Sequence, residues 1–498
     1  MYIGGLDVGT SGCKVTVYDT DGNYVTSAYE EYDVKRVGGE HEIDVDSIVE
    51  AVYKVIAKTA KEYELAALGV TSFGESFVAL DENDKILAPS MLYTDPRGQD
   101  EVAELCEKLG EDRIISIAGV MPHSMYSLPK IMWIRKNKPE MYAKIKRIML
   151  IEDLVVYLLS GVAAIDYSLA ARTMALDIRN LCWSKEIFEA AGVDISLMSS
   201  LVKTGTAAGK IKPELAKRLG ISPETVIVNG CHDQVAASVG AGMLSSGGAV
   251  NGSGTVECIT PCFDTVPEDK EFYKDGYCAV PYVVDGTYVC YAFSFTGGAV
   301  LKWYRDSFAK QEKQLCAESG ENVYALLDSK IPEKPTGILV LPHFAGAATP
   351  YMDNGSRAAM IGLTLETSGE DVYKALMEGV AYEVMMNLER VGKGGIAPCE
   401  LYATGGGSSS PVWLQIKADV LGIPITVIDA KEAGALGCCM LASVAIGAID
   451  SLEAAKEKFV KVGKTYRPRE EYSEKYRKYY KAYKEVYTSV RPIVDKCN

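Results

Sequence analysis

Two short glycine-containing turns, each between two strand-like segments, constrain the fold more than any other feature of the 498-residue sequence. The first turn, DVGTSG at 7–12, lies between YIGGL and KVTVYD, and the second, NGSGTV at 251–256, lies between GGAV and ECIT. A repeated strand-turn-strand unit indicates two domains of related design. The sequence therefore predicts two α/β domains, 1–244 and 245–498, that each present one turn to a shared cleft.

The segments between and after these turns alternate between helical and strand patterns. SIVEAVYKVIAKTAKEY at 47–63 repeats apolar residues at helical spacing, and ELAALGVTSF at 64–73 is strand-like. The longest uncharged run, 433–449, is short for a membrane span and rich in Gly, Ala and Ser, so it predicts a helix packed tightly against a sheet. Tyrosines at three- and four-residue steps predict a C-terminal docking helix: Tyr472, Tyr476, Tyr479, Tyr480, Tyr483 and Tyr487.

Charge and cysteine content narrow the class of protein. A formal net charge of −15 argues against nucleic acid and membrane surfaces as partners. The 13 cysteines do not form the spaced CxxC pairs of a zinc site, and the chain does not open on a basic leader. We therefore expect reduced thiols in a cytoplasmic enzyme.

The first turn has the composition of a nucleotide phosphate cradle. Glycines that admit backbone amides, two hydroxyls and one cation follow in order: Gly9, Thr10, Ser11, Gly12 and Lys14. Asp7 would then hold a hydrated Mg²⁺ that bridges phosphates through water. The alternative is an ordinary β-hairpin turn. The segment is neither a P-loop nor a dinucleotide-binding turn, because it lacks GxxxxGK[ST] and is followed by a strand.

Three further segments add candidate chemistry. A phosphate chain held by a second turn at 252–255 needs no basic patch, since amides and hydroxyls do most of the work. Asp233, between an apolar strand and a helix, can accept a proton from a substrate hydroxyl, or can simply cap that helix. Gly405–Gly407 would let a flat ring pack on the backbone, or form a plain turn between a strand and a helix.

In this order the motifs resemble those of the FGGY carbohydrate kinases. The resemblance runs through nearly the whole chain, in DVGTSGCK, GVMPHSMYSLPKIMWIRKNKPE, NGCHDQVAA, NGSGT, FTGGAVLKWYRD, ATGGGSSSP and EAGALG. The second of these looks most like the xylulokinase form. Each motif alone is weakly specific, whereas seven in register are strongly specific.

The resemblance implies a two-lobed fold of the actin, Hsp70 and hexokinase type, with a ribonuclease-H-like sheet in each lobe. ATP and Mg²⁺ would bind between the lobes and a sugar deeper in the first, with Asp233 as catalytic base and Asp7 positioning the metal. Relatives are commonly dimers, so a homodimer is an open expectation. By position, the phosphate contacts would be Thr10, Ser11, Lys14, Gly254 and Thr255, and the nucleoside site Gly298, Lys302, Gly406, Gly407 and Ser410.

The sequence departs from the family in the sugar pocket. Gly74 and Glu75 stand where xylulokinases typically carry Met-His and glycerol kinases Arg-Glu, which predicts a more acidic pocket that repels a carboxylate. Met125 stands where glycerol kinases carry a Tyr, which argues against glycerol as the substrate. Asp95 either lines or braces the predicted sugar pocket, or is an ordinary turn residue.

These differences favour a neutral ketose or polyol such as D-xylulose, bound by Gly74, Glu75, Asp95 and Asp233. The alternatives are a kinase for gluconate, glycerol or another pentulose, and a catalytically silent regulator of the same fold. A further alternative is an actin- or Hsp70-like ATPase, but that function would leave the pocket segment around Glu75 unexplained.

Overall fold

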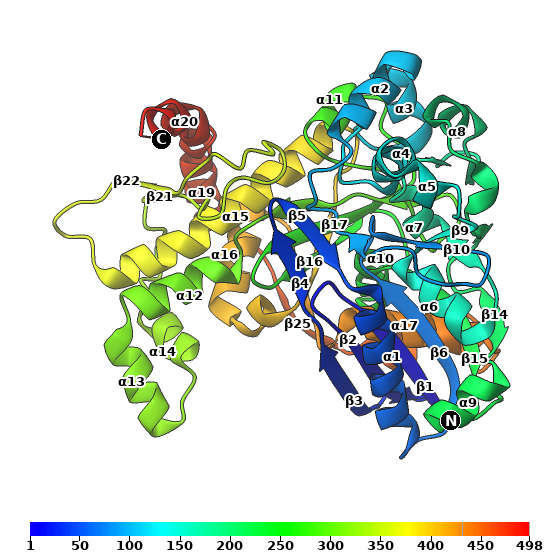
Figure 1. Ribbon diagram of the computed structural model, residues 1–498. Helices are drawn as coiled ribbons and strands as arrows, with labels where there is room; N and C mark the ends of the chain where they lie inside the picture. The colour runs from blue at the N-terminus through cyan, green and yellow to red at the C-terminus, as the bar shows by residue number, and fades with distance from the viewer. Residues whose placement is uncertain (431, 498) are drawn as a thin grey trace.

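The computed structural model describes residues 1–430 and 432–497, which form two α/β halves lying side by side (Figure 1). In this part of the chain the first half contains a six-stranded sheet in the order β14-β15-β6-β1-β2-β3. An antiparallel meander, β1–β2–β3, continues into strands β6 and β15, which run parallel to β1. The strands are β1 (Tyr2–Val8), β2 (Gly12–Asp19), β3 (Tyr24–Glu31), β6 (Leu65–Ser72), β14 (Ala207–Lys210) and β15 (Val226–His232).

The second half repeats this arrangement in an eight-stranded sheet of the described residues. Hairpin β16–β17 is again followed by two strands, β23 and β24, parallel to the first strand of the hairpin. The two-lobed fold with related sheets is therefore confirmed. The strands are β16 (Gly248–Ser253), β17 (Glu257–Phe263), β18 (Val280–Pro281), β19 (Tyr288–Val289), β20 (Ala292–Ser294), β23 (Glu400–Thr404), β24 (Ile425–Ile428) and β25 (Val462–Tyr466).

Helices cover both faces of the first sheet. On one face, α1 (Val45–Ala60), α6 (Ile151–Ser160) and α9 (Pro213–Leu219) share a core with Leu6 and Val8 of β1. On the other face, α10 (Asp233–Gly240) and α17 (Ala433–Ala445) share a core with Ile3. The first sheet is thus completed by a helix from the far end of the chain.

Glycines in the sheet let α17 lie directly on the strands. A Cβ on Gly5 would lie 2.1 Å from the Ala435 carbonyl oxygen, and one on Gly69 would lie 2.5 Å from that of Cys438. Any side chain at either position would push the helix away. Most of the uncharged run at 433–449, from Ala433 to Ala445, is therefore a helix packed tightly on a sheet, as its small residues predict.

Smaller elements surround the two sheets. The further helices are α2 (Gln99–Leu109), α3 (Glu111–Ala118), α4 (Ser127–Asn137), α5 (Pro139–Tyr142), α7 (Tyr167–Ala171), α8 (Lys185–Ala191), α11 (Lys270–Lys274), α12 (Gly298–Ser307), α13 (Lys310–Ser319), α14 (Val323–Lys330) and α18 (Leu452–Phe459). Short strand pairs and triplets are β4 (Val34–Val37), β5 (Glu40–Ile43) and β8 (Ser90–Met91); β7 (Phe77–Leu80) and β9 (Arg147–Leu150); β10 (Ala164–Asp166) and β13 (Ser200–Val202); β11 (Leu176–Asp177) and β12 (Cys182–Trp183); and β21 (Leu339–Leu341) and β22 (Ala359–Ile361).

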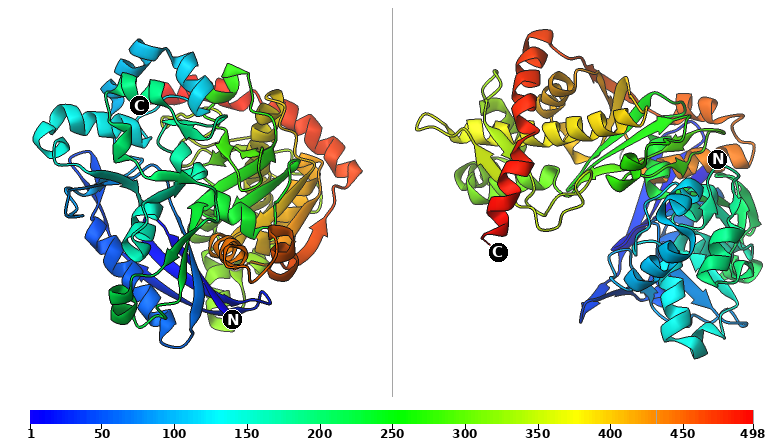
Figure 2. Two further views of the ribbon diagram at one scale, coloured as in Figure 1. Left: turned by 90° about the vertical axis from the view of Figure 1, so that its right-hand side faces the viewer. Right: turned by 90° about the horizontal axis from the view of Figure 1, so that it is seen from above.

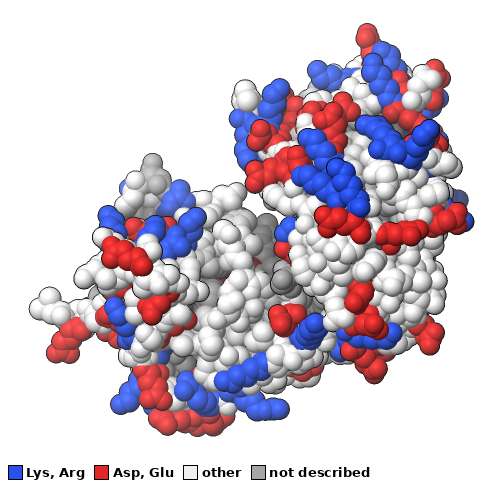
Figure 3. All heavy atoms as spheres, turned by 90° about the horizontal axis from the view of Figure 1, so that it is seen from below, with Lys and Arg blue, Asp and Glu red and all other residues white. Residues whose placement is uncertain are grey.

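The two halves have separate outlines when the molecule is seen from above or from below (Figure 2 and Figure 3). Seen from above, the N-terminus lies on one half and the C-terminus on the other (Figure 2). Seen from below, a hollow lies between two masses whose charged side chains gather mainly on the outer faces (Figure 3). None of the helices in 1–430 and 432–497 combines the length and apolar character needed to cross a bilayer.

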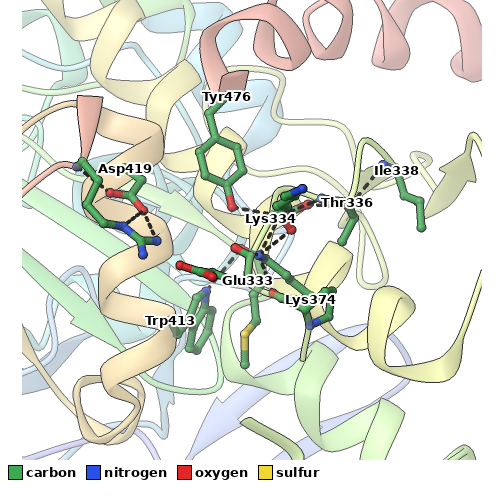
Figure 4. A network of polar contacts seen from close by, with 12 residues as sticks. Glu333, Lys334, Thr336, Ile338, Lys374, Trp413, Asp419 and Tyr476 are labelled. Atoms are coloured by element: carbon green, nitrogen blue, oxygen red, sulfur yellow. Dashed lines mark hydrogen bonds and ion pairs between the residues drawn. The ribbon is translucent and has the colours of Figure 1, made fainter. Parts of the chain in front are cut away.

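The C-terminal helices dock on the second half. Tyr476, Tyr480 and Tyr483 of α19 (Glu470–Tyr483) are buried, mainly against α15 (Gly369–Lys393) and α16 (Pro411–Leu421). The Tyr476 hydroxyl donates to Glu378 at 2.9 Å, as part of the polar network in Figure 4. The tyrosine stripe therefore forms a buried face of α19 as far as Tyr483, whereas Tyr487 belongs to the next helix, α20 (Val486–Asp495).

Candidate active site

The predicted catalytic residues gather at one edge of the first sheet. In the register of the three parallel strands, Val8 pairs with Ser72 and Ser72 with His232, so β1, β6 and β15 end at the same level. The first phosphate turn, the Gly74–Glu75 segment and Asp233 follow these three ends. Ligands of α/β sheets bind at the carboxyl ends of parallel strands. The corresponding ends of β16 and β23 carry the second turn and the glycine-rich segment.

Asp233 is the first residue of α10, and its surroundings suit a proton acceptor. Burial and the negative charges of Asp7 and Glu75 raise the pKa of Asp233 to about 7. His232 Nδ1 lies 3.3 Å from Asp233 Oδ1, but burial and the Arg172 charge hold the pKa of His232 well below its usual range, so the ring is neutral. His232, not Asp233, occupies the N-cap position, and no hydrogen bond within the described residues satisfies Oδ1.

Asp7 faces the start of α17. Its Oδ2 lies 3.3 Å from where a Cβ on Gly434 would sit. Burial and the charge of Glu432 raise the pKa of Asp7 to about 6, while Lys14 lowers it. Glu432 forms an ion pair with Lys14. A half-buried carboxylate near a second, partly exposed one supplies the oxygen donors that a hard divalent cation prefers, so these residues fit a hydrated Mg²⁺.

The predicted phosphate turn at 7–12 is only partly buried. Gly9 donates its backbone N–H to the Gly12 carbonyl at 2.9 Å, which closes the turn. Thr10 is half-buried and Ser11 is exposed. Both residues are therefore accessible at the place where the sequence predicts a phosphate.

Glu75, which the sequence places in the sugar pocket, is not a free acid. Arg172 Nε donates to Glu75 Oε1 at 2.6 Å, both side chains are buried, and the guanidinium lies over the rings of Tyr126 and Tyr291 at 5.1 and 5.4 Å. Arg172 thus supplies, from the end of α7, the cation that the Gly74–Glu75 segment lacks. The expectation of a more acidic pocket is wrong, and with it the charge argument against a carboxylate-bearing sugar.

Gly74 leaves room for this arrangement. A Cβ at that position would lie 2.9 Å from His232 Cδ2 and 3.0 Å from Arg172 Cγ. Real Cβ atoms essentially never approach a neighbour within 3.0 Å, so a larger residue would displace the imidazole. The glycine therefore belongs to the packing of the pocket.

Asp95 acts as a brace. Arg97 donates to both of its carboxylate oxygens at 2.8 Å, and the His41 backbone N–H donates to Oδ2 at 2.7 Å. The carboxylate is buried, and these bonds hold its pKa below the usual range despite the desolvation. Burial raises the pKa of the nearby Tyr93 phenol, and the negative charges of Glu75 and Asp233 raise it further. Sequence reasoning missed Tyr93, although it lies in the same MLYTDPRG segment.

The second half contains a pocket of about 1080 Å³ between α12, α14 and α16. Every residue of this half predicted to bind nucleotide lines it: Gly254, Thr255, Gly298, Lys302, Gly406, Gly407 and Ser410. The Ser410 hydroxyl donates to Asp328 at 2.6 Å and accepts from the Trp413 backbone N–H at 3.1 Å, so it caps α16. Aromatic and acidic wall residues that sequence reasoning missed are Trp303, Tyr324, Asp328, Tyr373 and Trp413.

Glycines form the floor of this pocket. Gly298 donates its N–H to the Gly254 carbonyl at 2.8 Å, and a Cβ on Gly298 would also lie 2.8 Å from that oxygen. A Cβ on Gly407 would lie 2.5 Å from Ser253 Cβ. The second turn, α12 and the glycine-rich segment meet closely because these positions lack side chains.

Comparison with known proteins agrees with this architecture. Models of the N-terminal and C-terminal domains of the FGGY family of carbohydrate kinases match residues 2–240 and 274–446. A gluconokinase of Bacillus subtilis is 29% identical over 489 residues, covering 96% of this chain and 93% of the relative. A xylulose kinase of Lactococcus lactis is 27% identical over 504 residues, covering 99% and 97%. The solved structure of ligand-bound xylulose kinase from Lactobacillus acidophilus has a TM-score of 0.89 at 24% identity, covering 100% of both chains.

Two α/β halves built on related sheets define a two-lobed fold of the actin and hexokinase type. Within that class, the chain belongs to the FGGY family of carbohydrate kinases.

Proposed function

We propose that this carbohydrate kinase transfers the γ-phosphoryl group of ATP to a hydroxyl of a neutral ketose or polyol, with D-xylulose as the first candidate. The observation that supports the proposal best is Asp233, whose half-buried carboxylate has a raised pKa and lies at the strand ends that also carry the predicted phosphate turn. The relative named xylulose kinase, similar over 99% of the chain, supports the sugar.

In the proposed reaction, Asp233 accepts the proton of the attacking hydroxyl. The hydroxyl oxygen bonds to the γ-phosphorus while the bond from phosphorus to the bridging oxygen of ADP breaks. Backbone amides of the two turns, the hydroxyls of Thr10, Ser11 and Thr255, and Lys14 would hold the phosphates. Mg²⁺, when bound beside Asp7, neutralises phosphate charge. Gly298, Lys302, Gly406, Gly407 and Ser410 would line the nucleoside site.

Gluconate is the second candidate, and one observation favours it. Arg172 offsets the charge of Glu75, so a carboxylate-bearing sugar meets no net acid there. A relative named gluconokinase is 29% identical. Glycerol, another pentulose and the silent-regulator function remain as alternatives without a supporting observation.

Four further expectations belong to the proposal. We expect the division into domains to lie at residues 244 and 245, and the order of strands in the two sheets supports it. A cytoplasmic location is supported by 13 free cysteines. Asp95 would support the sugar pocket through Arg97 and His41. The homodimer stays a prediction.

The test is a coupled ADP assay over a panel of ketoses, alditols and aldonates. Asp233→Asn should lose at least about 100-fold in kcat, within the range for a lost general base. Asp21→Asn, an exposed acid in the β2–β3 turn, serves as the control and should retain activity. Unchanged turnover in Asp233→Asn would show that Asp233 is not the catalytic base. Binding of both sugar and ATP without turnover would favour a catalytically silent regulator. Release of ADP in the absence of sugar would favour a partner-driven ATPase.

A further inference from the structure

A buried ion pair lies behind the second phosphate turn. Lys417, in the middle of α16, and Glu257, the first residue of β17, each expose only 1% of their side chains and form a short contact between Nζ and Oε1. Nζ also contacts Ser253 Oγ at 2.5 Å and Asn251 Oδ1 at 3.1 Å. All three ammonium protons therefore have acceptors, and all three acceptors flank the turn.

The same network joins the two arms of the turn. Ser253 Oγ donates to Glu257 Oε2 at 2.6 Å, and Asn251 Nδ2 donates to Glu257 Oε1 at 2.7 Å. Ser253 ends β16 and Glu257 opens β17, and the two residues pair in the ladder. The intervening residues 254–256 are thus held at both ends by one buried cluster, which leaves their backbone amides in a fixed arrangement.

Lys417 also connects the turn to the wall of the pocket. Its Nζ lies 4.4 Å from the centroid of the Trp413 ring, and Trp413 lines the large pocket together with Gly254 and Thr255. Lys417 and Glu257 do not line the pocket themselves. They therefore act on a bound ligand only through the turn and the wall.

Stability alone does not account for a charged pair at this place. Removing two charges from water is costly, and well-packed apolar residues of similar volume often stabilise as much as a buried pair. Several polar partners converge here on one turn, and a displacement of about 1 Å in a reacting group can cost about 100-fold in rate. We propose that Lys417 and Glu257 are positioning residues that set the conformation of residues 254–256 for the nucleotide phosphates. This inference rests on the proposed nucleotide site.

The main test compares wild type with the double variant Lys417→Met/Glu257→Gln, in which no charge is left unpaired. The KM for ATP and the Kd for MgADP, measured by titration calorimetry, should rise by about tenfold or more. The KM for the sugar should stay within about threefold, because the sugar pocket is built elsewhere. Glu257→Gln alone, which is isosteric, should raise the Kd for MgADP by at least about threefold and provides the test if the double variant does not fold.

A matched control is available in Lys374→Met. Lys374 is also a buried lysine of the second half, but its Nζ donates to the carbonyls of Pro332, Glu333 and Lys334 at 2.8–2.9 Å and does not contact the turn (Figure 4). This variant should lower Tm and leave the Kd for MgADP unchanged. Wild-type affinity for MgADP in a folded double variant, or equal losses for sugar and nucleotide, would overturn the inference. Failure of wild type to bind MgADP would overturn the nucleotide site itself.

Discussion

Arg172 and Glu75 lie 97 positions apart in the sequence and form a buried ion pair in which Arg172 Nε donates to Glu75 Oε1 at 2.6 Å. The pair is enclosed by the rings of Tyr126 and Tyr291, and the second ring comes from the other half of the chain. In the proposed function this pairing matters for the choice of sugar, because a lone carboxylate would repel an anionic substrate more strongly than a carboxylate paired with a cation does.

Removing one partner of this pair should be far more damaging than removing both. Arg172→Met leaves the Glu75 carboxylate buried without a counter-charge and should lower the free energy of unfolding by about 3–5 kcal/mol. Arg172→Met/Glu75→Gln should recover most of that loss. Urea denaturation of the three proteins measures the effect, and strictly additive losses would contradict the pairing.

Glu75→Gln should weaken sugar binding more than nucleotide binding. The substitution removes an anionic acceptor from the sugar side of the cleft and leaves the pocket of the second half untouched. Steady-state kinetics should show a rise in the KM for the sugar with little change in the KM for ATP. A fall in ATP affinity with sugar affinity retained would place Glu75 outside the sugar site.

The rate should fall as pH decreases below about 7, because the pKa of Asp233 is raised to about 7 and only its ionised form accepts a proton. Negative charge at Glu75 contributes to that rise. In Glu75→Gln, Asp233 therefore ionises more readily, and the acid limb of kcat/KM for the sugar should move to lower pH. A limb that stays in place, or moves upward, would show that the two carboxylates are not coupled.

Gly407→Ala should impair nucleotide binding. The new methyl group would lie 2.5 Å from Ser253 Cβ and force apart the glycine-rich segment and the second turn. The KM for ATP should rise by about tenfold or more, with the sugar KM retained. Gly392→Ala is the control, because a Cβ there meets nothing within 4 Å. Equal behaviour of the two variants would argue against the close contact.

Stability should decline as pH rises from about 4 to about 8. Asp153 is fully buried, and desolvation raises its pKa to about 8, so the folded state holds a proton that the unfolded chain releases near pH 4. This contribution is complete below pH 4 and is lost as pH rises to about 8. Asp153→Asn should flatten the pH dependence of the free energy of unfolding by up to about 1.4 kcal/mol per pH unit. An unchanged slope in denaturation at pH 5, 6, 7 and 8 would refute this.

Local patterns sufficed to predict much of this molecule. Glycine turns, the strand before Asp233 and the tyrosine stripe of α19 are each encoded within about ten residues, where backbone preference and periodicity act. Gly406 and Gly407, which line the pocket of the second half, were also predictable from a local strand-turn-helix pattern.

Pairings across the chain were not predictable in this way. Arg172 meets Glu75, Lys14 meets Glu432, and Lys417 meets Glu257 only because the sheets bring their elements together. The charge of a pocket depends on such partners, so an inference from Gly74 and Glu75 alone gave the wrong sign.

The placement of α17 on the first sheet has a consequence for biosynthesis. Residues 2–232 leave the ribosome long before residues 433–445, yet the glycine-lined face of their sheet is covered by that late helix. The nascent first half therefore emerges with an open apolar face and cannot complete its core during most of translation. The earliest strands of the chain can therefore complete their core only after residues 433–445 have been made.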